Sequence, residues 1–164
     1  MPVRSLSGNQ DLGLLRLAFS DMFPTVGPPI HVNHPLHQGD TPLHDHDFLE
    51  LAVVSAGHAV HRTIHGQQAI RPGDCFVLQP GQWHAYENAH ELALYNLCLG
   101  PDLLLRELAW ARSDPVLSCL FPSRPPAISE GKRRRAAAQG VISLHFPAAE
   151  LIEIVAELER LRLI

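Results

Sequence analysis

The residues best suited to chemistry in this sequence are histidines and a glutamate at strand-like spacing. His44 and His46 are two positions apart, and Glu50 follows four positions after His46 in the apolar-rich segment 42–57. Alternate residues of a β-strand point to the same face, so these side chains are expected to share one face. His84 follows a Pro-Gly turn at the head of another strand-like run. Three imidazoles and a carboxylate suit a divalent transition metal such as Zn, Ni, Fe, Mn or Co, and the cation would compensate for their burial.

Short strands must position these residues. From residue 48 to residue 100, strand-length apolar runs are separated by glycine and proline at roughly ten-residue spacing, which is typical of a β-sandwich or barrel. The 14 prolines and 11 glycines agree with many short connections. Residues 1–22 predict either a short amphipathic helix or an extended arm, and residues 24–39 predict a loop with an edge strand. The sequence therefore indicates an all-β fold over most of its length.

The pattern changes after Pro101. Leucines at helical spacing predict a helix over 102–112, residues 122–140 are expected to be a connection, and residues 141–147 are expected to return as a strand. A last helix is predicted to open at Pro147, since proline suits the first helical turn. We therefore expect a β-barrel followed by C-terminal α-helices.

The last helix carries an apolar stripe at three- and four-residue spacing, formed by Leu151, Ile154, Val155, Leu158 and Leu161. The stripe either packs on the barrel or pairs with the same helix of a second subunit, and its near-heptad spacing favours a homodimer. We expect one structural unit with two parts. Residues 1–100 would form the barrel with an N-terminal arm, and residues 101–164 would form a helical extension with the dimerisation helix.

Composition and charge exclude several classes of function. The 164 residues carry a net charge of −4, and the only basic run, at 132–135, is expected to be a solvated loop rather than a DNA-binding face. Cys75, Cys98 and Cys119 form no CxxC pair, which favours a reducing compartment. No apolar run is long enough to span a bilayer, and no secretion signal is convincing. We expect a soluble, cytoplasmic protein without membrane contact.

Two stretches together resemble the cupin family. Its first motif is matched by Gly39, His44, His46, Glu50 and Gly57, with one residue fewer than usual between the first glycine and the first histidine. Its second motif is matched by Gly73, Pro80, Gly81, His84 and Asn88, with the proline directly before the glycine. The resemblance implies a double-stranded β-helix, or jelly-roll barrel, with metal ligands at His44, His46, Glu50 and His84. The alternative is a metal-free cupin whose histidines hydrogen-bond in a polar pocket.

The order of segments across residues 30–162 is also similar to the sensor half of the arabinose-regulator (AraC) family, above all the branch with the rhamnose regulators. That resemblance implies a barrel that binds a small effector, often a sugar, and helices that dimerise. It also implies a separate domain with two helix-turn-helix units that binds DNA. The sequence does not contain such a domain. The chain is therefore expected to be either a piece of a longer regulator or a stand-alone sensor-like cupin.

Candidate effector-binding residues lie in the same segments. Tyr86 shares strand parity with His84, Trp83 lies in the adjoining turn and Tyr95 lies in the closing strand. Aromatic faces stack on sugar rings, and tyrosine hydroxyls, Gln79 and His61 can hydrogen-bond sugar hydroxyls. The alternative for Trp83 and Tyr95 is a place in the core or at the rim.

Three functions remain open from the sequence. The favoured one is an effector-sensing domain of an AraC-type regulator, which takes a small polar, sugar-like ligand and reaches DNA only through another domain. The alternative is a metal-dependent cupin enzyme of the dioxygenase or sugar-isomerase type, for which the sequence offers no catalytic residue beyond the metal ligands and tyrosines. A storage or interaction protein is the third.

Overall fold

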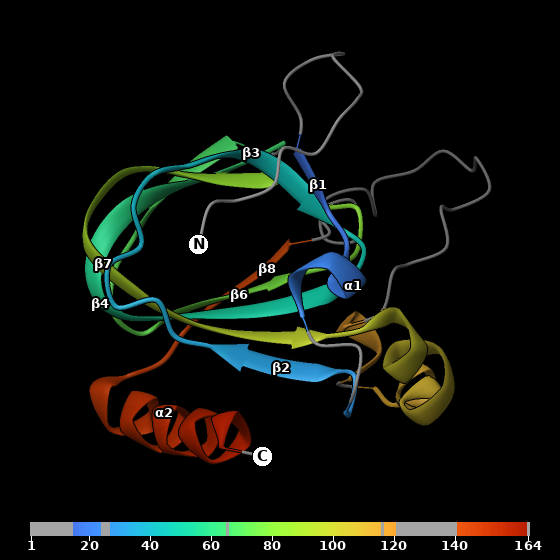
Figure 1. Cartoon of the computed structure of the whole chain (residues 1–164). Helices are drawn as coiled ribbons and strands as arrows, with labels where there is room; N and C mark the ends of the chain where they lie inside the picture. The colour runs from blue at the N-terminus through green and yellow to red at the C-terminus, as the bar shows by residue number, and fades with distance from the viewer. Residues whose placement is uncertain (1–14, 24–26, 65, 116, 121–140, 164) are drawn as a thin grey trace, which may run out of the picture.

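The computed structural model describes residues 15–23, 27–64, 66–115, 117–120 and 141–163. The strands are β1 (Leu15–Leu17), β2 (Ile30–Asn33), β3 (Thr41–His46), β4 (Leu49–Thr63), β5 (Gly66–Ile70), β6 (Asp74–Leu78), β7 (His84–Leu99) and β8 (Val141–His145). The α-helices are α1 (Phe19–Met22) and α2 (Ala148–Arg162). Figure 1 shows the strands rolled into a barrel, with α2 beside it. The prediction of an all-β fold followed by a C-terminal helix is confirmed.

The two longest strands, β4 and β7, pair antiparallel along almost their whole length and form the backbone of the barrel. The sheet order is β1-β3-β7-β4-β6-β8, with β2 added to β7 and β5 added to β4. The pairing of β4 with β7 shifts register around Gly57, which has a φ of +71°. A Cβ at Gly57 would lie 2.2 Å from the carbonyl oxygen of Glu91, so only glycine fits. The bulge bends both strands, which lets the sheet close on itself (Figure 1).

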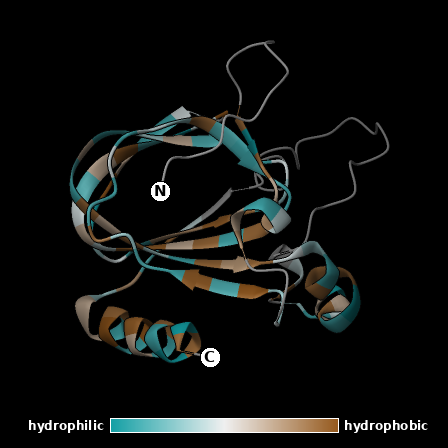
Figure 2. Ribbon diagram, viewed as in Figure 1, coloured by the Kyte–Doolittle hydropathy of each residue, from teal (hydrophilic) through white to brown (hydrophobic). Residues whose placement is uncertain are grey.

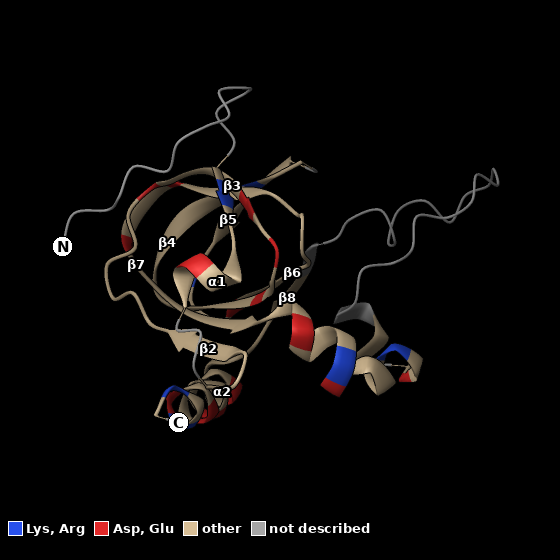
Figure 3. Cartoon of the chain, turned by 45° about the vertical axis from the view of Figure 1, so that its right-hand side comes forward, with Lys and Arg blue, Asp and Glu red and all other residues tan. Residues whose placement is uncertain are grey.

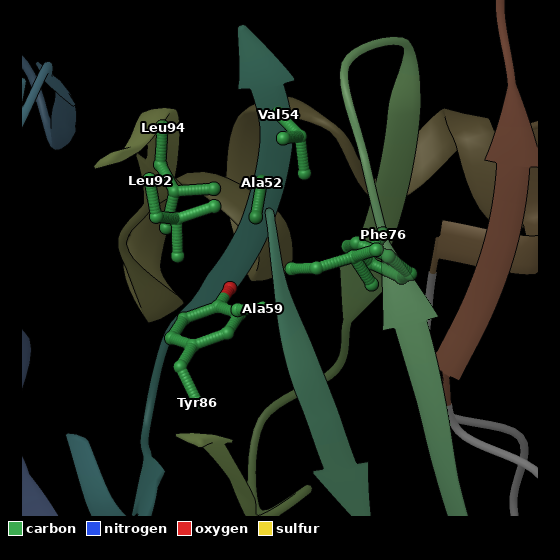
Figure 4. Close-up of a cluster of buried hydrophobic side chains, with 8 residues drawn as sticks. Ala52, Val54, Ala59, Phe76, Tyr86, Leu92 and Leu94 are labelled. Atoms are coloured by element: carbon green, nitrogen blue, oxygen red, sulfur yellow. The ribbon is translucent and has the colours of Figure 1, made fainter. Parts of the chain in front are cut away.

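Residues alternate between the inside and the outside of the barrel. The inward set is an apolar cluster, drawn in Figure 4, that contains Ala52, Val54, Ala59, Ile70, Phe76, Tyr86, Leu92 and Leu94. Strand β6 is buried along its whole length because its outward side chains are covered as well. Cys75 on this strand packs in the cluster under α2, and Val77 packs with the helical turns after residue 101. The strands of this wall are therefore apolar on both faces.

Helix α2 packs its apolar stripe on the outside of the barrel. Leu158 is buried, and Leu151, Ile154 and Val155 pack in the same cluster, against Val53 of β4. Burying a leucine contributes about 2 kcal/mol, so this contact is a substantial part of what holds α2 in place. Figure 2 shows hydrophobic and hydrophilic residues alternating around the helix. The first of the two alternatives for the stripe, packing on the barrel, is the one that the structure shows.

Helix α1 lies at one end of the barrel. The ring of Phe48, just before β4, has its centroid 5.8 Å from that of Phe19 and 5.6 Å from that of Phe23. The backbone N–H of Phe19 donates to the Asp47 carboxylate at 2.8 Å. Figure 3 shows the helix across the opening. Of the N-terminal segment 1–22, the described part thus holds a short strand, β1, followed by one turn of helix, and residues 1–14 lie outside the described residues.

The segment after Pro101 is helical, as expected, but not as one α-helix. It forms a π-helical turn, η1 (Leu103–Glu107), followed by the 3₁₀ turns η2 (Ala109–Ser113) and η3 (Leu117–Leu120). Strand β8 then pairs with β6, so the C-terminal part of the chain adds a strand to the sheet of the barrel. No helix among the described residues is long and apolar enough to cross a bilayer. The basic run 132–135 lies outside the described residues.

Candidate functional site

Three of the four expected metal ligands converge inside the barrel. His46 comes from the end of β3, Glu50 from the start of β4 and His84 from the start of β7. One ligand atom of each lies within 4.8 Å of the other two, and all three residues are buried. The Nε2 atom of His46 is 3.7 Å from Oε2 of Glu50. Three strand ends thus bring together two imidazoles and a carboxylate, a donor set typical of divalent transition metals.

The hydrogen bond of His46 fixes which nitrogen faces the set. Its Nδ1 donates to the backbone carbonyl of Phe48 at 2.7 Å, because a carbonyl can only accept. In the neutral ring Nε2 therefore carries a lone pair, and that buried atom has no hydrogen-bond partner among the described residues. A ligand histidine whose other nitrogen is bonded to a carbonyl is the usual arrangement at protein metal sites.

His84 is oriented by another histidine. Nδ1 of His84 lies 3.3 Å from Nε2 of His61, and the Nε2 atom of His84 is buried without a partner in the described part of the chain. When Nδ1 of His84 is the donor, its Nε2 offers a lone pair to the shared centre, as in His46. His61, expected to contact an effector, thus has a further contact that positions His84.

Burial controls the charge of these groups. It raises the pKa of Glu50 from 4.5 to about 7 and lowers the pKa values of His46 and His61 from 6.5 to about 4. The pKa of His84 falls well below its usual value, first through burial and then through the neighbouring histidines. The imidazoles are therefore neutral at pH 7, the form that binds metal. With two unpartnered imidazole nitrogens facing a carboxylate, these residues fit a divalent cation.

His44 lies beside this set rather than in it. Its Nδ1 donates to the backbone carbonyl of Pro42 at 2.9 Å, and its ring centroid is 4.3 Å from that of His84. It is not among the three residues whose ligand atoms converge. The pairing of β3 with β7 is irregular between Thr41 and His44, while residues 44–46 pair regularly with β1. His44 therefore lies next to His84, and its place as a fourth ligand stays a prediction.

The sequence of residues 30–158 matches the family described as the AraC-like ligand binding domain. The chain belongs to this family. The match covers the barrel from β2 to most of α2. The family prediction made from the two motifs and the order of segments is confirmed.

Two curated relatives of this AraC-like domain bear the name HTH-type transcriptional activator RhaR. The one from Mannheimia succiniciproducens is 31% identical over 91 residues, which are 56% of this chain and 33% of the relative. The one from Enterobacter sp. is 30% identical over 101 residues, 62% of this chain and 36% of the relative. The chain thus spans about a third of the length of these relatives. Among solved structures, ToxT K231A from Vibrio cholerae has a TM-score of 0.53 at 6% identity, over 82% of this chain and 48% of that one, which is a likeness of fold.

The remaining expected effector-binding residues of the AraC-like domain occupy different places. Tyr86 is inside the barrel, its ring stacked on His61 with centroids 5.3 Å apart, and its buried hydroxyl has no partner among the described residues. Figure 4 shows this hydroxyl directed into the apolar cluster. Trp83 lies with Arg62 and Gln67 around a separate, open pocket at one end of β4. Gln79 follows β6 directly and is partly buried.

Tyr95 faces away from the barrel interior of the AraC-like domain. Its hydroxyl donates to the Glu159 carboxylate of α2 at 2.7 Å, and its ring stacks on His34 with centroids 3.7 Å apart. It packs in the cluster between the barrel and α2. Tyr95 is therefore a residue of that contact, the core alternative considered for it, and it is not part of the interior site.

Two interior polar residues were missed from the sequence. Asn33 on β2 and Asn96 on β7 face each other across the strand pair, and the side-chain oxygen of each is buried without a partner in the described chain. Counting by twos from His84 reaches Asn96, so strand parity was the available signal. The two positive-φ residues within β7, Asn88 and Glu91, made that count unsafe without the structure.

Proposed function

We propose that this AraC-like domain is the effector-sensing part of a transcriptional regulator, and that it binds a small neutral, sugar-like molecule inside its barrel beside a divalent metal. His46, Glu50 and His84 would hold the metal, which would supply positive charge for a polar atom of the effector. The observation that carries the proposal is the convergence of these three side chains with two unpartnered imidazole nitrogens. Without a cation or ligand these buried groups would only destabilise the fold.

The surroundings support a binding role. His61 and Tyr86 stack next to His84 and present polar atoms to the same interior. Phe76 and Leu94 belong to the apolar cluster packed beside these polar groups, so the interior combines a few polar side chains with largely apolar surroundings. That combination is typical of small-molecule sites. Control of transcription, which the name of the relatives states for them, would follow if the effector changes how this domain contacts the rest of its regulator.

Elemental analysis tests the metal part of the proposal. Purified protein, reconstituted with Zn, Mn, Fe, Ni or Co, is expected to bind close to one equivalent and to melt at a higher temperature than the chelated protein. His46→Ala and His84→Ala should each abolish both effects. His58→Ala is the matched control, because His58 is an exposed histidine on β4.

Two outcomes would change the proposal. Absence of metal after reconstitution would remove the cation and leave a metal-free effector site in the same fold. Turnover of a dioxygenase or sugar-isomerase substrate by the metal-loaded protein would favour the enzyme alternative.

We further propose that the domain forms a homodimer along one flank of α2. The stripe that suggested a seam is used by the barrel, and the outward face carries charged residues such as Glu153 and Glu157. On the flank between the apolar stripe and this charged face lies Ile152, which is 70% exposed. Leu163, just after the helix, is 80% exposed. These exposed side chains support a second copy as the occupant.

Light scattering tests the dimer. The protein should have the mass of two subunits and Ile152→Glu that of one, whereas the control Leu105→Glu, at an exposed leucine in η1, should remain dimeric. A single-subunit mass for the unmodified protein would contradict the proposal.

A further inference from the structure

The buried polar side-chain atoms that lack a partner in the described chain all belong to residues of the barrel interior. They are Nε2 of His46, Nε2 of His84, the Tyr86 hydroxyl, and the side-chain oxygens of Asn33 and Asn96. The first three belong to the interior site described above. Strand pairing places the two asparagines on the interior as well. Asn96 pairs with Ala52 and lies two residues from Leu94, and both of those residues belong to the interior cluster.

The two asparagines are positioned to bond each other and do not. They are direct partners in the antiparallel pair β2–β7, where side chains stand about 5 Å apart at Cβ. A mutual amide hydrogen bond would give at least one of the two oxygens a donor, but both oxygens lack one. Two adjacent buried acceptors without donors are rarely left so in a core, and they point to a ligand or water that supplies the donors.

The asparagine pair adjoins the part of the sheet that carries Glu50, one of the three converging residues. Across the sheet, Phe76, Ala52, Asn96 and Asn33 form one row, and Leu78, Glu50, Cys98 and His31 form the adjacent row. Glu50 and Asn96 are therefore diagonal neighbours on adjoining strands. Ala52, the smallest side chain of its row, separates the amides from the Phe76 ring. The row thus offers an apolar ring on one side and two amides on the other, which matches a molecule with a hydrocarbon face and a hydroxyl edge.

We propose that Asn33 and Asn96 form a hydroxyl-recognition site for a neutral polyhydroxy effector, which their side-chain oxygens bind as acceptors. The inference rests on the proposed sensing function and adds the chemistry and the residues of recognition. Hydroxyl groups supply the missing donors. Carboxylates and phosphates do not, because ionised oxyanions only accept. The site therefore selects sugars and polyols over organic acids.

Thermal-shift and calorimetric titrations of the metal-loaded protein test the proposal. The probes are D-glucose, L-rhamnose, L-arabinose, D-xylose and sorbitol, with decanoate and benzoate as carboxylate probes. At least one polyhydroxy probe is expected to raise the melting temperature, and Asn33→Leu and Asn96→Leu should each weaken its binding at least tenfold. The same variants should melt at the same or a higher temperature without probe, because leucine needs no hydrogen bond. Gln67→Leu, an exposed amide on the outward face of β5, is the matched control and should bind normally.

Other results overturn the inference. Equal binding of a sugar by the wild type and both leucine variants would show that the amides take no part, while the sensing function would stand. Binding of a carboxylate and no polyhydroxy probe, or of no probe at all, would refute the ligand class and leave the family and the metal site untouched. A large loss of melting temperature in both variants would make the amides structural. If a leucine variant does not fold, Asn96→Ser, which stays polar but shortens the acceptor, must still show the weakened binding.

Discussion

Replacing Glu50 by glutamine is expected to make the metal-free protein more stable at alkaline pH and to change little in acid. Glu50 is only 7% exposed, and burial raises its pKa from 4.5 to about 7. A carboxyl whose pKa is higher in the folded protein than in the unfolded chain makes its full contribution to the stability of the folded state below the unfolded pKa. That contribution is lost as the pH rises through the folded pKa. In the metal-free wild type, stability should therefore fall between about pH 4.5 and pH 7, and the glutamine variant should lack this loss.

The size of the effect follows from the pKa. Each pH unit corresponds to about 1.4 kcal/mol, so raising the carboxyl pKa from 4.5 to about 7 costs about 3 kcal/mol once both states are ionised. At about pH 8.5 the glutamine variant should gain nearly all of this relative to wild type, and at about pH 5 it should gain less than about 1 kcal/mol. The amide also changes local packing, but that change is the same at both pH values.

Urea denaturation in the presence of chelator, at both pH values, measures the difference. Glu87→Gln is the control, because Glu87 is an accessible carboxylate paired with Arg62 at 3.0 Å, and its effect should be small. With saturating metal the order should reverse, since the cation stabilises the wild-type carboxylate. A difference between wild type and Glu50→Gln that does not vary with pH would refute the reasoning, because it would mean that the carboxylate is solvated or already paired.

Three further predictions concern the frame of the site. Gly57→Ala should lower the free energy of unfolding by at least about 2 kcal/mol, because its Cβ would meet the Glu91 carbonyl at a positive φ. Urea denaturation measures this loss. An unchanged free energy of unfolding would mean that the bulge can relax. Leu158→Ala should cost about 2–4 kcal/mol by the same assay, against less than about 0.5 kcal/mol for the exposed control Leu105→Ala, which lies outside the proposed dimer contact. His61→Phe keeps a ring beside Tyr86 but removes the partner of His84, so calorimetry should show metal affinity about tenfold weaker; unchanged affinity would deny His61 its positioning role.

The candidate site was predictable where it depends on local spacing. His46 and Glu50 lie on two consecutive strands of the chain rather than on one, yet their four-residue spacing brings them together across the short connection between β3 and β4. The position of His84 was predictable because a Pro-Gly turn precedes its strand and indicates where that strand begins. His44 is not in the converging group, although its ring contacts that of His84, and its place as a fourth ligand stays a prediction.

By itself the sequence determined the type of most elements, because alternation of apolar residues, glycine and proline turns and helical spacing are local properties of the chain. The family resemblance extended this to the closed barrel and the inward histidines. Only the tertiary structure decided which polar residues meet. Tyr95 hydrogen-bonds to α2, the stripe of α2 packs on the barrel, and Asn33 and Asn96 stand opposite each other inside. These outcomes depend on strand register and on the bulge at Gly57, which changes which residues of β4 and β7 face each other. Register is fixed by the packing of the whole sheet.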